Sequence, residues 1–318
     1  MTIQFFILIA GLVLILMGAN WLVDGASSIA KKTGMSEFII GITIVGIGTS
    51  TPEMVVSFIS ALQGKPDMAV GNVVGSNIFN TFLILGATAL ICPLAISKES
   101  LKRDLPLNIL VTALLILLGL KTTIFGFGSD TLTRLDGALL LTLFAAYMWT
   151  LLRSKNTQQS KEEADTKVLS TWKSIVFIVL GLGCLIFGGR LFVNSATNIA
   201  EHYHMSQKFI ALTIMAAGTS LPELATSIVA AIKGRGQLAL GNVLGSNIFN
   251  ILLILGGSAL IHPLSFSAMT PVDLGAVMIG AIFMLTSAYT FKTNKLDRFE
   301  AVILLLLEAG YMTWLFMN

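Results

Sequence analysis

Two segments of this chain, 170 residues apart, are near copies of each other. Residues 48–94 read GTSTPEMVVSFISALQGKPDMAVGNVVGSNIFNTFLILGATALICPL, and residues 218–264 read GTSLPELATSIVAAIKGRGQLALGNVLGSNIFNILLILGGSALIHPL. They align without a gap, and 27 of the 47 positions are identical. The same offset pairs Gly18 with Gly188, so the repeat begins near the start of the chain. Such a repeat limits the fold to one built from two equivalent halves.

Long apolar runs show that the repeated unit is a membrane unit. The 318 residues are 55% hydrophobic and 12% charged, and the mean hydropathy of +0.85 is typical of a polytopic membrane protein. A run of about 20 apolar residues crosses the roughly 30 Å hydrocarbon layer as a helix. Ten such runs predict ten transmembrane helices, near 4–30, 37–62, 68–91, 104–120, 133–152, 174–199, 207–232, 238–261, 271–291 and 299–317.

The longest polar interruption, residues 153–173, divides the ten spans five and five. We therefore predict a first five-helix repeat at 1–152, a cytoplasmic linker at 153–173 and a second five-helix repeat at 174–318. Because five is an odd number, the second copy must enter the membrane upside down relative to the first. The predicted fold is an all-α polytopic membrane protein with ten transmembrane helices in two inverted five-helix repeats, an architecture of many secondary transporters.

The basic residues predict how the chain is oriented. With the amino terminus outside, 15 of the 20 Lys and Arg residues fall on one side of the membrane and five on the other. The positive-inside bias then places both termini outside the cytoplasm, and we expect a prokaryotic plasma (inner) membrane. The basic residues are scattered among loops, so nucleic acid is not an expected partner.

A glutamate follows a proline in the repeated TSxPE motif, inside an apolar span. Glu53 lies a little past the middle of the second span, and Glu223 holds the matching place in the seventh. An acidic residue near the bilayer centre costs roughly 3 kcal/mol, so it normally faces a partner, a cation or a water-filled cavity. Two such carboxylates, facing each other across a pseudo-two-fold axis, would repel unless a cation lay between them or one carried a proton.

Oxygen-bearing residues accompany both glutamates. Pro52 and Pro222 each remove a helical hydrogen bond and kink the helix, which frees carbonyl oxygens. Hydroxyl and amide side chains follow the same spacing in both copies, at Thr49, Ser50, Ser76 and Asn80 and at Thr219, Ser220, Ser246 and Asn250. This set contains no histidine or thiolate, so it suits Ca2+ and Na+ and argues against Zn2+ or Cu+. Two carboxylates balance one Ca2+, and Na+ ions on the same oxygens would exclude it, as an antiporter requires.

At these residues the sequence resembles the Na+/Ca2+ exchanger branch of the Ca2+/cation antiporter superfamily. GTSTPE with GNVVGSNIFN, and GTSLPE with GNVLGSNIFN, are similar to its two alpha-repeats, and the likeness in span pattern covers nearly the whole chain. The resemblance implies Ca2+ coordination by the two glutamates and by backbone oxygens at Thr49 and Thr219. It implies Na+ sites that share those glutamates with Ser50, Ser220, Ser76 and Ser246. It also implies that the first and sixth spans slide across the remaining bundle to switch access.

Asn80 and Asn250 differ from the equivalent residues of some members of that family. Some relatives carry Asp at one of these places, and in K+-dependent exchangers an acidic residue there is tied to K+. With amides at both positions, we predict no K+ requirement and a weaker pH dependence than in Asp-bearing relatives. H+/Ca2+ exchangers usually have a glutamate within the GN segment, whereas GNVVG and GNVLG have none.

The leading hypothesis is a secondary antiporter that exchanges Na+ for Ca2+ by alternating access and extrudes Ca2+. We expect no enzymatic activity, no cofactor and no obligate protein partner, with the two cations and the lipid bilayer as partners. An H+-coupled or other divalent-cation antiporter using the same site is the nearest alternative. A channel fits less well, because permeation needs weak sequential sites. An acid-pair protease is disfavoured, because both carboxylates lie in the same TSxPE setting.

Several further polar residues lie within apolar spans. Glu308, in the tenth span, is expected to face the bundle and form a hydrogen bond there. Asp24 and Arg190, in the first and sixth spans, are interpreted as lying toward opposite membrane faces at the mouths of cavities. The remaining asparagines of the repeat are interpreted mainly as helix-packing residues, at positions 72, 77, 242 and 247.

Overall fold

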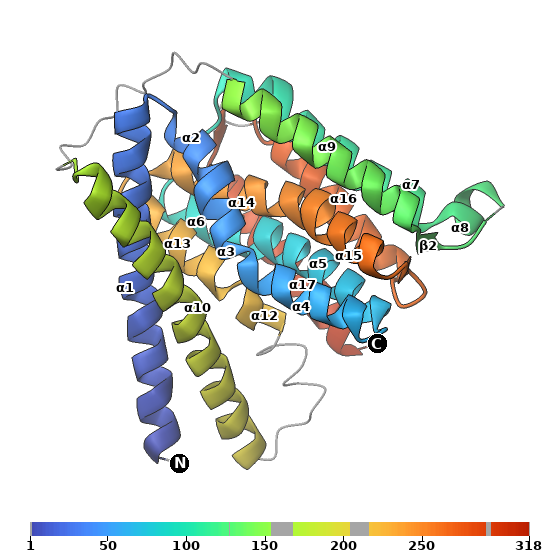
Figure 1. Ribbon diagram of the computed structural model, residues 1–318, viewed down its shortest axis with the longest axis horizontal. Helices are drawn as coiled ribbons and strands as arrows, with labels where there is room; N and C mark the ends of the chain where they lie inside the picture. Colours follow the sequence, from blue (N-terminus) through green and yellow to red (C-terminus); the bar gives the residue numbers. More distant parts are fainter. Residues whose placement is uncertain (1, 127, 154–167, 204–215, 291–293, 318) are drawn as a thin grey trace.

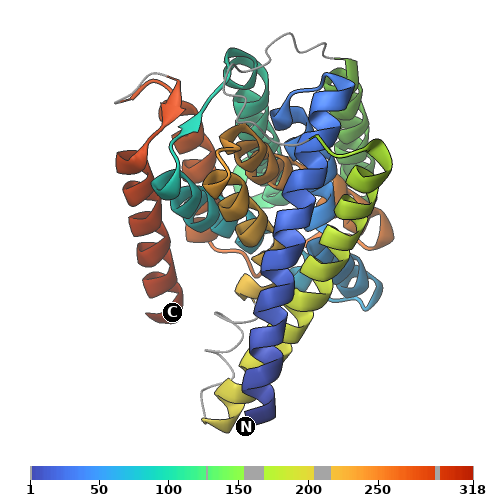
Figure 2. The same ribbon diagram turned by 90° about the vertical axis from the view of Figure 1, so that its left-hand side faces the viewer.

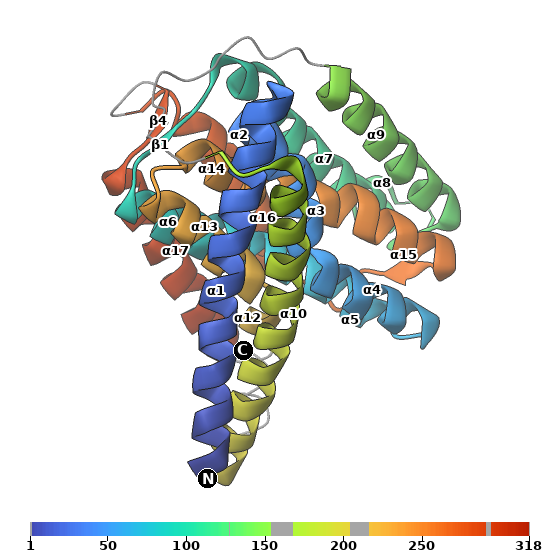
Figure 3. The same ribbon diagram turned by 60° about the vertical axis from the view of Figure 1, so that its left-hand side comes forward.

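The computed structural model describes residues 2–126, 128–153, 168–203, 216–290 and 294–317, which form one helical bundle (Figure 1). Two long helices, α1 (Thr2–Thr33) and α10 (Thr171–His202), lie side by side and extend beyond the rest of the bundle (Figures 2 and 3). The first described residues of α1 and the last of α17 (Arg298–Met317) lie toward the same side of the molecule, as Figure 2 shows.

The first half of the chain is built from short helical segments joined end to end. Three of its segments are wider π-helical turns, labelled η. In chain order after α1 the elements are α2 (Glu37–Ile40), η1 (Gly41–Val45), α3 (Gly46–Thr49), α4 (Thr51–Leu62), α5 (Pro66–Phe79), η2 (Asn80–Ile84), α6 (Leu85–Ile91), β1 (Leu94–Ala95), η3 (Ser100–Asp104), α7 (Leu105–Gly119), α8 (Lys121–Phe125), β2 (Thr131–Leu132) and α9 (Arg134–Arg153).

Within the described residues the second half follows this order, except that no π-helical turn corresponds to η3. After α10 the elements are α12 (Ala216–Thr219), α13 (Leu221–Ile232), α14 (Gly236–Phe249), η5 (Asn250–Leu255), α15 (Gly256–Ile261), β3 (Leu264–Ser265), α16 (Pro271–Thr286), β4 (Lys295–Leu296) and α17. Residues 207–215 of the predicted seventh span lie outside the described chain, as do residues 154–167 of the predicted linker. The division at 153–173 therefore stays a prediction.

The helices agree with the predicted membrane fold. In the described chain, six continuous helical stretches are long and apolar enough to cross a membrane, and a bent pair, Glu37–Thr49 with Thr51–Leu62, makes a seventh. Two shorter apolar helices, α13 and α16, lie within the seventh and ninth predicted spans, and α7 within the fourth. The predicted all-α fold of ten spans in two repeats is confirmed.

Two short antiparallel ladders follow the symmetry of the repeat. β1, after α6, pairs with β4, which precedes α17, and Leu94 lies opposite Leu296. β3, after α15, pairs with β2, which precedes α9, and Thr131 lies opposite Ser265. Each ladder thus joins the end of a central helix of one half to the start of the last helix of the other half.

Glycines bring α1 and α10 into backbone contact. A Cβ atom on Gly18 would lie 2.7 Å from the carbonyl oxygen of Gly181, and one on Gly188 would lie 2.9 Å from that of Gly11. Residues without side chains at these points let the two helix axes approach closely. α1 and α10 therefore form a tightly packed pair beside the central helices.

The central helices of the bundle are α5 with α6 and α14 with α15. In the most apolar stretch of Gly236–Ile261, 94% of the residues are buried, and in that of Pro66–Ile91, 72% are. The corresponding stretches of α1 and α10 are only 33% and 22% buried. The two copies of the GN motif, GNVVGSNIFN and GNVLGSNIFN, thus lie in the best-buried part of the molecule.

Candidate ion-binding site

The span that carries Glu53 is broken immediately before it. α3 ends at Thr49, α4 begins at Thr51, and the stretches Glu37–Thr49 and Thr51–Leu62 are bent by 47° relative to each other. Pro52 stands in the first turn of α4, where a missing backbone N–H costs nothing. The second half has the same break, because α12 ends at Thr219 and α13 begins at Leu221. The predicted kink is confirmed at Ser50, and it places each glutamate in the first turn of a new helix.

Each of these glutamates is hydrogen-bonded to a serine of the other repeat. Ser220 Oγ donates to Glu53 Oε1 at 3.0 Å, and Ser50 Oγ donates to Glu223 Oε1 at 2.9 Å. Both glutamates are only 1% exposed. The inverted repeat therefore brings Glu53, Glu223, Ser50 and Ser220 into one buried cluster.

Other predicted ligands surround this cluster unequally. Ser246 Oγ lies 2.9 Å from Ser50 Oγ, and Thr49 Oγ1 donates to Asn242 Oδ1 at 3.0 Å. Thr219 is adjacent to the Glu53 carboxyl. Ser76 is buried but is not hydrogen-bonded to either glutamate; instead it lines a cavity. The structure thus places Ser246 closer to the glutamate cluster than its counterpart in the first repeat.

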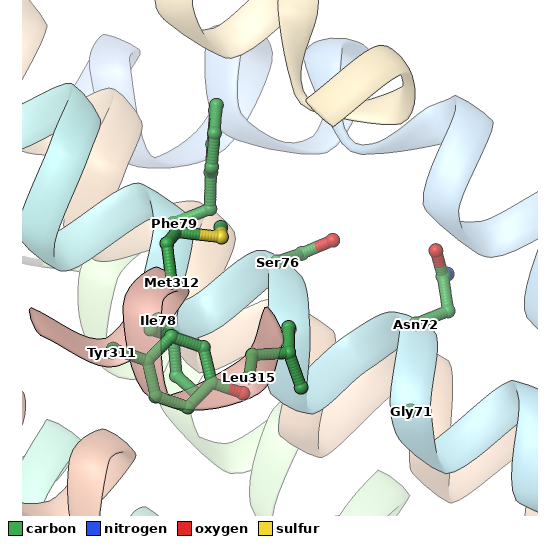
Figure 4. Close-up of a pocket in the computed structure, with 9 residues that line it drawn as sticks. Gly71, Asn72, Ser76, Ile78, Phe79, Tyr311, Met312 and Leu315 are labelled. Carbon is green, nitrogen blue, oxygen red and sulfur yellow. The ribbon is translucent and has the colours of Figure 1, made fainter. Parts of the chain in front are cut away.

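The cavity beside Ser76 measures about 90 Å³ and lies between α5 and α17 (Figure 4). Asn72 and Ser76, four residues apart, extend from the same side of α5, while Tyr311 and Leu315 belong to the opposite wall. A volume of this size holds a few water molecules. The cavity therefore gives the predicted ligand Ser76 a space next to it that water or a small cation can occupy.

Four buried oxygens of the predicted site have no hydrogen-bond partner among the described residues. They are Glu53 Oε2, Glu223 Oε2, Asn80 Oδ1 and Asn250 Oδ1. A buried polar atom without a partner costs about 1–3 kcal/mol, so four of them call for another ligand. Hard cations such as Ca2+ prefer oxygen ligands of this kind. The described residues contain no cluster of three or more His, Cys, Asp or Glu, so the donor set is two carboxylates with neutral oxygens.

Two asparagines support the backbone on which the glutamates stand. Asn72 Nδ2 donates to the Glu53 carbonyl at 3.1 Å and to Ser57 Oγ at 2.9 Å. In the other repeat Asn242 Nδ2 donates to the Glu223 carbonyl at 3.4 Å and to the Ser227 hydroxyl at 3.0 Å. The sequence interpretation missed this role. The identity of these serines and asparagines in both copies was the available signal.

The other repeated asparagines join the two central helices. Asn77 Nδ2 donates to the Asn247 carbonyl at 3.2 Å, and Asn250 Nδ2 donates to Asn77 Oδ1 at 2.9 Å. Asn247 Nδ2 donates to Thr81 Oγ1 at 2.8 Å. The interpretation of positions 77 and 247 as helix-packing residues is confirmed. The amide nitrogen of Asn250 is thereby hydrogen-bonded, and its oxygen Oδ1 is left available to coordinate a cation.

Both central helices change to a π-helical turn at the predicted ligand Asn80 or Asn250. η2 begins at Asn80 and η5 begins at Asn250. Such wide turns are rare and are frequently found at functional sites. The sequence gives no sign of them.

Glu308 differs from its predicted environment. It is 5% exposed, as expected for a residue facing the bundle, but neither carboxyl oxygen has a hydrogen-bond partner among the described residues. The predicted hydrogen bond is therefore wrong within this part of the chain. Tyr311, one turn further along α17, does not bond Glu308 but donates its hydroxyl to Asp273 Oδ1 at 2.8 Å. The neighbouring η2 and α6 offer no charged partner, because residues 80–91 contain no ionisable side chain.

Comparison with known proteins identifies the family. The family model described as sodium/calcium exchanger protein matches residues 3–153 and 173–317. The sodium/calcium exchanger MaX1 of Methanosarcina acetivorans is 34% identical over 99% of this chain and 99% of its own length. The inner membrane protein YrbG of Escherichia coli is 37% identical over 81% of this chain and 79% of its own.

A solved structure has the same fold. The sodium-calcium exchanger NCX_Mj, soaked with 2.5 mM Na+ and 10 mM Sr2+, superposes with a TM-score of 0.85 and 30% identity, covering 98% of both chains. With the family model matching both halves and relatives matching along nearly the full length, the resemblance at the TSxPE and GN motifs is confirmed. The chain is an integral membrane protein and belongs to the sodium/calcium exchanger family.

Proposed function

We propose that this chain exchanges Na+ for Ca2+ by alternating access and that it extrudes Ca2+ from the cell. The observation that carries the proposal is the reciprocal bonding of Glu53 to Ser220 and of Glu223 to Ser50. Two buried carboxylates held together across an inverted repeat form a single site that both repeats share. A site shared in this way can be exposed to either side of the membrane in turn.

The free oxygens of the site suggest how the two cations compete. In our proposal Ca2+ binds between Glu53 and Glu223, whose charges balance it, with backbone oxygens of Thr49 and Thr219. Na+ ions use the same glutamates together with the four repeat serines, Ser50, Ser220, Ser76 and Ser246. Asn80 and Asn250 offer neutral amide oxygens. Because both cations need the glutamates, occupancy by one excludes the other, and this exclusion couples their movements.

The α1–α10 pair is the proposed moving part. Its helices are joined to each other through glycine contacts, and its most apolar stretches are less buried than those of α5 and α14. A pair that is tightly joined internally but packed on only one side can slide as a unit. Its movement would close one entrance to the site while opening the other.

We further infer the setting of this exchange. The positive-inside bias supports an inner-membrane protein with both termini outside the cytoplasm. An ion exchanger of this design needs neither a cofactor nor a covalent reaction step, so we infer a transporter without enzymatic activity.

Measurement of 45Ca2+ uptake into proteoliposomes tests the proposal. Vesicles loaded with Na+ and diluted into Na+-free buffer should accumulate 45Ca2+, whereas vesicles loaded with K+ or choline should not. A parallel set carries a pH gradient without Na+. Uptake that follows the pH gradient and ignores Na+ would replace Na+ with H+ as the coupling ion.

A further inference from the structure

Lys233 links the α1–α10 pair to the rest of the bundle at one end of the molecule. Its Nζ lies 2.7 Å from Asp24 Oδ1 and 3.3 Å from the Asn20 carbonyl oxygen, both on α1. α1 also packs against α13, at whose carboxyl end Lys233 stands. This contact lies on the face that carries most of the basic residues and that we predict to be cytoplasmic.

The turn that carries Lys233 is fixed to the bundle. Arg235 Nη1 pairs with Glu37 Oε1 at 2.7 Å, at the start of α2, and the Arg235 side chain is only 6% exposed. The Arg235 amide donates to the Ala230 carbonyl at 2.7 Å, and Gly234 between the two basic residues has a φ of +71°. Lys233 therefore extends from a rigid point, so its bond to Asp24 opposes movement of α1 away from the bundle.

The repeat builds the same turn at the opposite face with an uncharged residue in the place of Lys233. Gln63 is the counterpart of Lys233, and its φ and ψ of −82° and 2° match the −80° and 5° of Lys233. Gly64 has a φ of +66°, close to that of Gly234. The counterpart of Asp24 is Asn194, on α10. Both Gln63 and Asn194 are exposed, and no hydrogen bond joins either side chain to another described residue.

We propose that Asp24 and Lys233 form a one-sided lock on the cytoplasmic entrance to the ion site. The lock rests on the proposed function, because it acts on the sliding of α1 and α10. Two uncharged turns of equal shape would hold the two entrances alike. An ion pair at one of them stabilises the state in which that entrance is closed. The resting protein therefore offers its site to the outside, and opening toward the cytoplasm requires the Asp24–Lys233 contact to break.

The size of this bias follows from the exposure of the pair. The Lys233 and Asp24 side chains are 28% and 45% exposed, so water weakens their attraction. Ion pairs of this kind change a two-state ratio by a factor of about two to five. The lock is thus strong enough to set the resting state and weak enough to open in every transport cycle.

Hydrogen–deuterium exchange on the full-length protein in detergent, without Na+ or Ca2+, tests the lock. Deuterium uptake is compared between peptides at the locked entrance, near residues 20–33 and 225–236, and peptides at the opposite entrance, near residues 55–66 and 190–200. The first variant, Asp24→Asn with Lys233→Gln, replaces each residue by its own counterpart. The mirror control, Asn194→Asp with Gln63→Lys, adds the same pair of charges at the other entrance and leaves Asp24 and Lys233 in place.

Both variants should raise deuterium uptake at the locked entrance relative to the opposite entrance, by about two- to fivefold. Neutralisation weakens the contact that closes the locked entrance, and the mirror control adds a contact that closes the opposite one. Charge reversal, Asp24→Lys with Lys233→Asp, should restore the wild-type ratio. If the neutral variant leaves both entrances unchanged, or if charge reversal behaves like neutralisation, the lock is disproved. Should the double variant lose its monodisperse elution, Asp24→Asn alone gives the same test.

A separate transport measurement distinguishes this proposal from the proposed function. Na+-driven 45Ca2+ uptake by the wild type reports the function, whereas the deuterium measurement needs no transported ion. Absent uptake with a shifted deuterium ratio would overturn the ion assignment and keep the lock. Normal 45Ca2+ uptake with an unshifted deuterium ratio would keep the ion assignment and overturn the lock.

Discussion

The two repeats agree at the centre of the molecule and differ at its entrances. At the centre, Ser50 and Ser220 make equivalent bonds to Glu223 and Glu53, with lengths of 2.9 and 3.0 Å. At the entrances, the turns at 63–65 and 233–235 share a backbone conformation but carry different charges. Among the described residues, the second turn has a lysine that pairs with α1, and the first turn has no such pair with α10.

This difference separates two tasks of an alternating-access protein. The ion site must present the same oxygens whichever side is open, so the residues around it are kept alike. The entrances need not be alike, because unequal contacts there decide which side is open at rest. In our proposal, sequence identity between the repeats thus marks the residues that bind the ions, and sequence difference marks the residues that bias the transport cycle.

The largest effect is expected from removing one glutamate charge. Glu53→Gln and Glu223→Gln each leave a single carboxylate against a divalent ion, and truncating one member of such a buried charged contact costs about 3 kcal/mol or more, roughly 100-fold in affinity. Na+-driven 45Ca2+ uptake should fall to background in both variants. Because the two glutamates hold matching places in the two repeats and make equivalent serine bonds, the two losses should be of the same order. Near-normal uptake in either variant would contradict the site assignment.

A smaller loss is expected from the serines that bond the glutamates. Ser50→Ala and Ser220→Ala each remove a hydroxyl bonded to a carboxylate, worth about 1.5 kcal/mol or roughly tenfold in the Ca2+ concentration that half-saturates uptake. Ser50 also contacts Ser246 at 2.9 Å, so its loss should be the greater of the two. Ser287→Ala is the matched control, since Ser287 is buried but its hydroxyl, among the described residues, bonds only the Met284 carbonyl. An equal effect of this control would show that the losses are not specific to the site.

Much of the glutamate cluster could be predicted from the sequence, because the residues that form it occur in both repeats. A buried glutamate such as Glu53, directly after a proline in an apolar span, has few structural explanations. A second one at Glu223, in the same motif, makes a purely structural role less plausible still. The support given by Asn72 to the Glu53 carbonyl could not be predicted, since amide side chains pack helices and bind backbone equally well. Glu308 has no copy, so nothing in the sequence indicated that both its oxygens would lack partners among the described residues.

The arrangement of helices could also be predicted from the sequence, whereas their local irregularities and their contacts could not. Apolar runs of membrane length locate helices, and an odd number per repeat fixes the inversion. The π-helical turns at Asn80 and Asn250 depend on packing between helices, which local sequence does not encode. The contact of Gly18 with Gly181 also required knowing that α1 and α10 are neighbours.

The α1–α10 contact offers a test on the stability of the pair. In Gly188→Ala the new Cβ would lie 2.9 Å from the Gly11 carbonyl oxygen, whereas in Gly189→Ala it meets no described atom within 4 Å. Overpacking of this kind costs about 1–3 kcal/mol, so Gly188→Ala should lower the melting temperature by about 5 °C while Gly189→Ala leaves it nearly unchanged. Thermal unfolding of the purified variants in detergent makes the comparison. Equal shifts would show that the two helices are not in backbone contact.

The smallest effect on 45Ca2+ uptake is expected from tests of Asn80 and Asn250, where both repeats carry an amide. Asn80 and Asn250 add no charge to the site, so replacing choline by K+ at constant Na+ should leave the uptake of 45Ca2+ unchanged. Asn250→Asp adds a third carboxylate for which protons compete, so uptake by this variant should fall more steeply than that of the wild type as the pH is lowered. Asn80→Asp should do the same if the two halves contribute equally. A K+ requirement in the wild type would mean that a cation site exists beyond the oxygens that the two repeats share.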